Sequence, residues 1–308
     1  MKIAFLGTPD FAVPSLEKLC MLGHEIAVFT QPDRPVGRKA VLTPPPVKVF
    51  AEARGIPVFQ FEKIKSPEGV AALKAFGPDL MVTAAFGQLL SRENLDIPPL
   101  GCVNVHGSLL PKYRGAAPIQ WAIVNGESVT GVTTMLTDIG MDTGDILLKA
   151  ETPIGPDETY GELSERLSRL GAELLAETLS RIEAGTLVPV SQCESEATKC
   201  TMIRKEHAKL DFARPCLEIH NKVRGFNPWP VAYGMHGADA VKIYHTKLTR
   251  KSTGLPAGTL TGSEKEGLFI ACGDGLLEIL EIQAPGGKRL DGKTFLRGKP
   301  IAGRVFNI

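Results

Sequence analysis

The strongest constraint on the fold is an alternation, over roughly the first two hundred residues, between short apolar segments and helical segments. The apolar segments are nearly continuous, as in strands that are covered on both faces. A strand, a helix and a further strand at this spacing favour right-handed crossovers and parallel pairing. We therefore predict an α/β fold with an open, mostly parallel, Rossmann-like sheet and helices on both faces. The predicted strands are residues 2–7, 25–30, 79–85 and 102–106, and the predicted helices include 15–23, 47–55 and 67–77.

The remainder of the chain predicts two further strands, a long helix and a second domain. Residues 130–151 indicate two strands joined by a Gly- and Asp-rich loop, and an apolar stripe over 160–184 predicts the longest helix. Later, short β-rich segments alternate with turns, which favours a small antiparallel C-terminal β-barrel, OB-like in kind. We expect a catalytic domain at 1–190, a linker at 191–208 and the barrel domain at 209–308.

Composition excludes several classes of protein. The formal net charge is +1, so charge over the whole chain favours neither a nucleic-acid nor a membrane partner. Six scattered cysteines without a CxxC pair argue for a reduced, cytoplasmic protein without structural zinc. The apolar run that follows Lys2 is too short for a signal peptide. We expect no metal and no membrane contact, and a monomer, because no assembly motif is present.

Two polar side chains interrupt the predicted strand 102–106. Asn104 and His106 are two residues apart, so they point to the same face at the strand's carboxyl end, where parallel sheets bind ligands. The loop 138–145 adds carboxylates, Asp142 among them. An amide, an imidazole and a carboxylate suit acyl transfer to an amine without a covalent enzyme intermediate. The competing interpretation of His106 is a buried histidine with a structural role. It stays open because the sequence does not show that Asp142 reaches His106.

Residues 104–123 ("NVHGSLLPKYRGAAPIQWAI"), together with "DTGD" at 142–145, resemble the signature of the folate-dependent formyltransferases. The resemblance is greatest to members that act on initiator tRNA. It implies transfer of a formyl group from 10-formyltetrahydrofolate to the amino group of methionine on initiator methionyl-tRNA, for initiation of translation. Further matching segments are residues 5–19, 29–38, 84–90, 205–212 and 224–233, which extend the similarity over essentially the whole chain.

The resemblance also implies roles for individual residues. Asn104 and His106 would stabilise the oxyanion of a tetrahedral intermediate, and Asp142 would orient His106 and help to move protons. The folate donor would bind along a segment after the strand and against a second wall. These predicted folate-binding residues are Ser108, Leu109, Leu110 and Pro111 in the segment, and Phe86 and Gln88 in the wall.

Two basic regions are candidates for contact with tRNA. The loop 31–48 is long for a strand-to-helix connection, and the resemblance places it beside the tRNA acceptor stem. The tail 288–308 holds six cationic residues against one aspartate, which favours phosphate binding through counterion release. A solvated surface is the alternative interpretation of both regions. The predicted contacts are Arg34, Arg38 and Lys39 in the loop, and Lys288 and Arg289 in the tail.

Other functions remain open at this point. A related formyltransferase would act on a small amine, such as an amino-sugar nucleotide or glycinamide ribonucleotide, but neither "PDRPVGR" nor a basic tail is expected there. An inactive RNA-binding module is a third possibility, against which the presence of Asn104, His106 and Asp142 argues. Dinucleotide binding is disfavoured, because "FLGTPDF" has one glycine where the fingerprint requires three.

Overall fold

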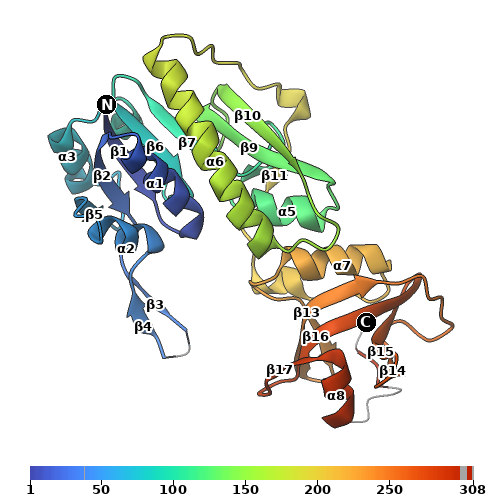
Figure 1. The fold of residues 1–308 in the computed structure, drawn as a ribbon. Helices are drawn as coiled ribbons and strands as arrows, with labels where there is room; N and C mark the ends of the chain where they lie inside the picture. The colour runs from blue at the N-terminus through green and yellow to red at the C-terminus, as the bar shows by residue number, and fades with distance from the viewer. Residues whose placement is uncertain (38, 299–303, 307–308) are drawn as a thin grey trace. The chain divides into compact units, whose positions relative to one another are not determined.

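The computed structural model describes residues 1–37, 39–298 and 304–306, and it divides into two compact units (Figure 1). Unit 1 comprises Met1–Gly115, Thr130–Thr152 and Ser164–Cys200, and unit 2 comprises Ala116–Val129, Pro153–Leu163 and Thr201–Ile308. Neither unit is one continuous segment, because the chain passes between them several times. The predicted linker, 191–208, is shared between the two units, since residues 191–200 belong to unit 1.

A seven-stranded sheet forms the centre of unit 1. Its strands are β1 (Lys2–Gly7), β2 (Glu25–Thr30), β5 (Val58–Gln60), β6 (Leu80–Ala84), β7 (Cys102–His106), β9 (Val129–Leu136) and β10 (Ile146–Pro153). They lie in the order β10-β9-β7-β6-β1-β2-β5. The pairs β1–β2, β1–β6, β6–β7 and β2–β5 are parallel, whereas β9 runs antiparallel to β7. The mostly parallel sheet predicted from the sequence is confirmed.

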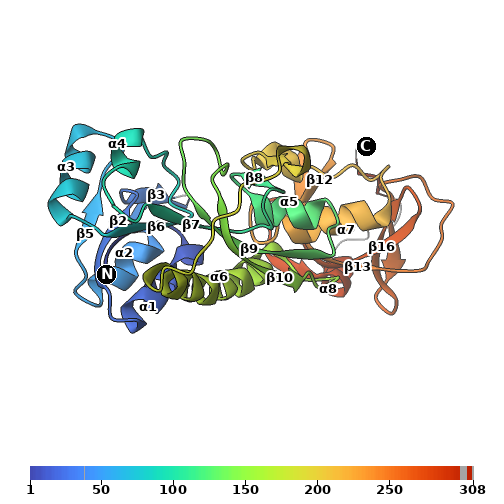
Figure 2. The same cartoon turned by 90° about the horizontal axis from the view of Figure 1, so that it is seen from above.

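Helices cover both faces of this sheet (Figure 2). One face carries α3 (Pro67–Phe76) and α4 (Arg92–Leu95), and the other carries α1 (Val13–Met21), α2 (Pro46–Glu52) and α6 (Tyr160–Glu183). Alternate strand residues such as Ala4, Leu6 and Met81 form a buried cluster with Leu73 of α3. Their neighbours, including Phe5, are fully buried as well. Burial on both faces explains why these strands have almost no polar residues.

Unit 2 contains an antiparallel sheet, as predicted, together with several helices. The strands are β12 (Tyr233–His236), β13 (Asp239–Leu248), β14 (Leu260–Ser263), β15 (Gly267–Cys272), β16 (Gly275–Gln283) and β17 (Arg289–Asp291), and the helices are α5 (Pro118–Val124), α7 (Cys216–Gly225) and α8 (Gly292–Gly298). The strand order is β12-β13-β16-β15-β14, with β17 beside β16. Alternate residues of β13, β15 and β16 pack with Ile219 and Val223 of α7 in one hydrophobic core.

Short elements occupy segments that the sequence left without regular structure. The loop 31–48 contains a two-stranded hairpin, β3 (Arg34–Val36) and β4 (Val41–Thr43), whose residues are exposed. Elsewhere β8 (Arg114–Gly115) pairs in parallel with β11 (Lys199–Cys200). The 3-10 turns are η1 (Asp10–Ala12), η2 (Glu194–Glu196) and η3 (Lys205–Ala208). The pair β8–β11 matters for function, because it joins residues from the predicted linker to the segment that follows Asn104 and His106.

The packing of α6 on the sheet generates a stability prediction. A Cβ atom at Gly171 would lie 2.8 Å from Val105 Cγ1 and 3.3 Å from Val132 Cγ1, so a larger side chain would force the helix away from β7 and β9. We expect Gly171→Leu to lower the free energy of unfolding by about 1–3 kcal/mol, as overpacking does. Ser180→Leu, at an exposed position of α6, should stay within about 0.5 kcal/mol of the wild type. Urea unfolding of both variants tests this, and equal losses would contradict it.

Candidate functional site

The carboxyl end of β7 places Asn104 beside the neighbouring strand. Thr83 of β6 is the register partner of Asn104, and its Oγ1 donates a hydrogen bond of 2.8 Å to Asn104 Oδ1. Because the oxygen of the amide is thereby occupied, the two N–H donors of Nδ2 point away from Thr83. Asn104 is half-buried, so this oriented donor lies at the edge of the protein interior.

His106 lies between a carbonyl group and a carboxylate. Its Nε2 is 3.0 Å from the carbonyl oxygen of Tyr113, and its Nδ1 is 3.7 Å from Asp142 Oδ2. A carbonyl oxygen only accepts, so Nε2 is the donor in this contact, and Nδ1 is the nitrogen that faces the carboxylate. A separation of 3.7 Å is too long for a direct hydrogen bond, and it leaves Nδ1 available to a reacting oxygen or a bridging water.

The Asp142 carboxylate is held from the opposite side by backbone. The N–H of Gly115 donates to Asp142 Oδ2 at 2.8 Å. Asp142 has a φ of +55°, a left-handed conformation that is uncommon outside glycine. Gly115 is required where it stands, because a Cβ there would lie 2.2 Å from the carbonyl oxygen of Cys200. The structure therefore places Asp142 beside His106, two residues along β7 from Asn104.

The predicted folate segment turns back on Thr133 of β9. Thr133 Oγ1 donates to the carbonyl oxygen of Ser108 at 2.7 Å and accepts from the N–H of Leu110 at 3.1 Å. The Ser108 hydroxyl donates to the carbonyl oxygen of Lys112, and Leu110 is buried with Met135. The side chains of Ser108 and Leu110 are thus engaged within the protein. Leu109 is only half-buried, and Pro111, after a cis peptide bond, ends the segment.

Phe86 and Gln88, the predicted second wall of the folate site, both contact other residues of the protein. The ring of Phe86 is 5% exposed and belongs to the cluster beneath α3, and its carbonyl oxygen accepts hydrogen bonds from Thr8 Oγ1 and Gln31 Nε2. The Gln88 side chain donates to the carbonyl oxygen of Phe61 and accepts from the N–H of Ile64. Both side chains are therefore engaged by contacts within the protein.

Cys102 lies two residues before Asn104 on β7 and is buried. It contacts the cluster beneath α3, and burial raises the pKa of its thiol to about 12. A thiol with that pKa forms almost no thiolate near neutral pH, and the thiolate is the nucleophilic form. Cys102 therefore packs as a small hydrophobic residue.

Two predicted tRNA contacts from the loop 31–48 can be placed. Arg34 forms an ion pair of 2.5 Å with Glu62, and Lys39 is exposed beside the hairpin β3–β4. Arg38 lies outside the described residues. Lys48, which also contributes to the basic character of this loop, pairs with Asp33 at 3.0 Å, so part of the positive charge is neutralised locally.

Of the two predicted contacts from the tail, Arg289 is held by neighbouring side chains and Lys288 is exposed. Arg289 donates from Nε to Glu281 Oε2 at 2.8 Å, and its guanidinium lies 4.2 Å from the centre of the Tyr244 ring. Lys288 is exposed. The ion pair and the ring contact fix Arg289 on the surface of the antiparallel sheet, whereas Lys288 presents its charge to solvent.

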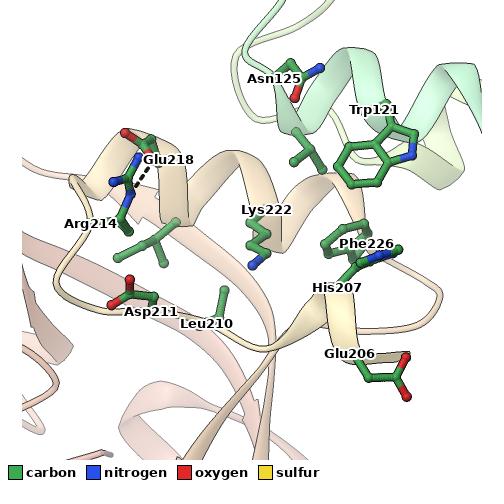
Figure 3. A pocket seen from close by; sticks show the side chains of 12 residues that line it. Trp121, Asn125, Glu206, His207, Leu210, Asp211, Arg214, Glu218, Lys222 and Phe226 are labelled. Carbon is green, nitrogen blue, oxygen red and sulfur yellow. Dashed lines mark hydrogen bonds and ion pairs between the residues drawn. The ribbon is translucent and has the colours of Figure 1, made fainter. Parts of the chain in front are cut away.

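A pocket of about 640 Å³ in unit 2 lies between α5, α7 and the chain that precedes α7 (Figure 3). Its charges are mixed: Arg214 pairs with Glu218 at 2.8 Å, and Lys222 Nζ donates to the carbonyl oxygen of Lys209 at 2.7 Å. Burial lowers the pKa of Lys222. These groups are satisfied by one another, and the pocket contains none of the predicted catalytic residues.

Among the residues that the structure describes, no helix is long and apolar enough to cross a lipid bilayer. Within the same part of the chain, no group of three or more His, Cys, Asp or Glu side chains is arranged to hold a metal ion.

Sequence reasoning missed the residues that orient the trio. Thr83 sets the amide of Asn104, Thr133 holds the segment 108–110, and the carbonyl group of Tyr113 holds His106. The signal for Thr83 was available, because it is a polar residue near the carboxyl end of a neighbouring buried strand. The contribution of Tyr113 had no signal in the sequence, since any residue supplies a carbonyl oxygen.

Comparison with known families agrees with this geometry. Residues 1–179 match the family described as formyl transferase, and residues 202–300 match the formyl transferase C-terminal domain. The first match contains β7 and the loop that carries Asp142. The two matches together span most of the chain.

Similar curated proteins extend over almost the full length. The methionyl-tRNA formyltransferase of Trichlorobacter lovleyi is 49% identical over 302 residues, which cover 98% of this chain and 95% of that protein. The protein of the same name from Acetivibrio thermocellus is 49% identical over 303 residues, covering 98% and 97%.

Solved structures share the fold at lower identity. The sugar 3N-formyl transferase WlaRD, crystallised in the presence of dTDP and 5-N-formyl-THF, has a TM-score of 0.68 at 21% identity, covering 92% of this chain and 97% of that one. HypX from Aquifex aeolicus, in complex with tetrahydrofolic acid, has a TM-score of 0.67 at 18% identity, covering 98% and 48%. These likenesses concern the fold.

The burial of Cys102 predicts its chemical inertness. At pH 8 only about 10⁻⁴ of a thiol with a pKa near 12 is ionised, so iodoacetamide should leave Cys102 unmodified in the native protein. Cys193, which is exposed, serves as the internal positive control. Peptide mass spectrometry after brief labelling measures both, and equal modification of the two cysteines would contradict the prediction.

Proposed function

The chain belongs to the formyl transferase family, and we propose that it transfers a formyl group from 10-formyltetrahydrofolate to the amino group of methionine on initiator tRNA. The observation that carries the proposal is identity of 49% over nearly the full length with proteins named methionyl-tRNA formyltransferase. The convergence of Asn104, His106 and Asp142 at one end of the parallel sheet supports the same chemistry.

Asn104 acts as an oxyanion donor in this mechanism. The neutral amine of methionine attacks the formyl carbon, a C–N bond forms, and the carbonyl electron pair moves onto oxygen. Since Thr83 occupies the oxygen of the Asn104 amide, Nδ2 is the group that presents N–H donors to this developing charge. A donor that is oriented before the reaction stabilises the tetrahedral intermediate without reorganisation.

His106 and Asp142 control charge and protons. A proton on His106 Nδ1 supplies a second donor to the oxyanion, and the nearby carboxylate stabilises the resulting imidazolium. Asp142 accepts the proton of the attacking amine through water. The intermediate then collapses, the bond to N10 breaks, and the proton held by Asp142 passes through water to that nitrogen as tetrahydrofolate leaves.

The formyl donor is placed against the segment 108–111. Thr133 fixes this segment from beneath, which leaves Leu109 as the side chain available to pack on the folate. Phe86 and Gln88 support the site from the core instead of by direct side-chain contact. Apolar packing with a rigid backbone edge is a common design for sites that bind a flat heterocycle.

In this proposal catalysis takes place in unit 1, and both units bind the tRNA. Unit 1 carries the chemistry, and exposed cations in both units, Lys39 and Lys288, contact the phosphates of tRNA. A catalytic domain at 1–190 and a barrel domain at 209–308 are retained as part of the proposal, without a separate linker at 191–200, as are a monomeric state and a cytoplasmic location. Arg34 and Arg289 would exchange their ion pairs with glutamates for phosphate contacts.

Removing the proposed oxyanion donors should abolish most activity. We expect Asn104→Ala and His106→Ala each to lower kcat by at least about a hundredfold, since one oxyanion donor contributes about 10²–10³. The measurement is formyl transfer to methionine-charged initiator tRNA, with free methionine and an amino-sugar nucleotide as alternative acceptors. Circular dichroism establishes that the variants fold.

Each outcome of this assay is informative. Transfer to the charged tRNA alone supports both the chemistry and the acceptor. Transfer only to a small amine would keep the catalytic roles and remove the tRNA assignment. A folded His106→Ala variant with wild-type kcat would overturn the catalytic assignment.

Binding to tRNA should depend steeply on salt. Each lost phosphate contact lowers the slope of log K against log [salt] by roughly one, so Lys39→Ala and Lys288→Ala should each reduce it by about that amount. Lys74→Ala is the matched control, because Lys74 is an exposed lysine that pairs with Glu93. Filter binding over a range of KCl concentrations measures the slope. Unchanged slopes in both variants would contradict the assignment of Lys39 and Lys288 as phosphate contacts.

A further inference from the structure

The segment 190–200 is fastened to the loop that carries Asp142, although the sequence predicted a linker from residue 191 onward. Val190 and Ile146 exchange backbone hydrogen bonds of 2.8 and 2.9 Å, and Ser191 Oγ donates to Asp145 Oδ1 at 2.9 Å. At its other end the segment forms β11, which pairs with β8. It is therefore an integral part of unit 1.

Gln192 is the centre of these contacts. Its Nε2 donates to the carbonyl oxygens of Asp142, at 2.8 Å, and Gly144, at 2.7 Å. Its Oε1 accepts from Arg114 Nε at 2.9 Å. Because a guanidinium only donates, Arg114 fixes which end of the amide faces it, and the N–H groups must then face the loop.

Arg114 is itself held in place, with only 2% of its surface exposed. Its two terminal nitrogens donate to the carboxylate of Glu194 at 3.0 and 2.7 Å. This hydrogen bonding lowers the pKa of Glu194, so the carboxylate is charged at neutral pH. A buried guanidinium with a bidentate partner is a rigid element, because breaking the pair would leave an uncompensated charge.

Two independent bonds thus fix Asp142. Gln192 holds its backbone carbonyl, and the N–H of Gly115 holds its carboxylate. The backbone needs such support, because a non-glycine residue at a φ of +55° is conformationally strained. The result is a carboxylate oxygen at 3.7 Å from His106 Nδ1.

We propose that Gln192, oriented by Arg114, is a positioning residue that holds Asp142 in its productive place. It acts through Asp142 and does not contact the reacting atoms. The inference rests on the proposed function, because that function gives Asp142 its role in moving protons. The segment that resembled a linker in the sequence is on this account a support of the active site.

Two substitutions separate the roles of Gln192. Gln192→Met preserves its volume and removes all three hydrogen bonds, whereas Gln192→Glu keeps an acceptor for Arg114 and loses both bonds to the loop. We expect both variants to lower kcat by about 10- to 100-fold, as a misplacement of about 1 Å does. KM for tRNA should change by less than about threefold, because ground-state binding is retained.

The matched control is Glu196→Gln in the same segment, an exposed carboxylate for which near-wild-type kcat is expected. Wild-type kcat in Gln192→Glu would overturn the inference, because Gln192 would then serve only as the partner of Arg114. If Gln192→Met does not fold, Gln192→Glu still provides the comparison.

A double-mutant cycle with Asp142→Ala distinguishes a positioning role of Gln192 from a merely structural one. It compares the effect of Gln192→Glu on kcat with and without the Asp142 carboxylate. If Gln192 acts through Asp142, Gln192→Glu should cost about 10- to 100-fold in the wild type and less than about threefold in Asp142→Ala. Equal losses in both backgrounds would overturn the inference. Absence of formyl transfer by the wild-type protein would instead count against the proposed function, so the two failures are distinguishable.

Discussion

The register of β7 with its two neighbours determines where Asn104 and His106 lie. Asn104 is opposite Thr83 of β6, and His106 is opposite Thr133 of β9. A shift by one residue would turn Asn104 and His106 to the other face of the sheet. It would also separate Thr133 from the turn that it holds after the strand. Burial of Val103 and Val105 on one face of β7 fixes this register, and the geometry of the proposed site follows from it.

Asp142, the third member of the trio, is not positioned by the register of a strand. Asp142 lies in a loop that follows β9, where no regular pairing sets its position. Contacts from Gly115 and from the segment 190–200 supply the missing constraint. A loop held by backbone and amide hydrogen bonds places the Asp142 carboxylate 3.7 Å from His106 Nδ1 without burying it completely.

The basic residues illustrate how a nearly neutral chain presents positive charge. Arg34 and Arg289 are each paired with a glutamate, whereas Lys39 and Lys288 are exposed. Ion pairs at the surface contribute little stability, so in the proposed function phosphates would replace the glutamates at small cost.

The sequence by itself determined the alternation of strands and helices, the mostly parallel sheet, the antiparallel second half and the identity of Asn104, His106 and Asp142 as candidates. These features depend on local periodicity and on the types of residue at a strand end, which one chain displays directly. Only the tertiary structure decided which side chains are available to a ligand. Phe86, Gln88 and Ser108 are taken up by contacts with residues distant in the sequence, and Gln192, in an apparent linker, meets Asp142. Such contacts depend on which distant segments meet in the folded protein. The order of residues along the chain does not show this.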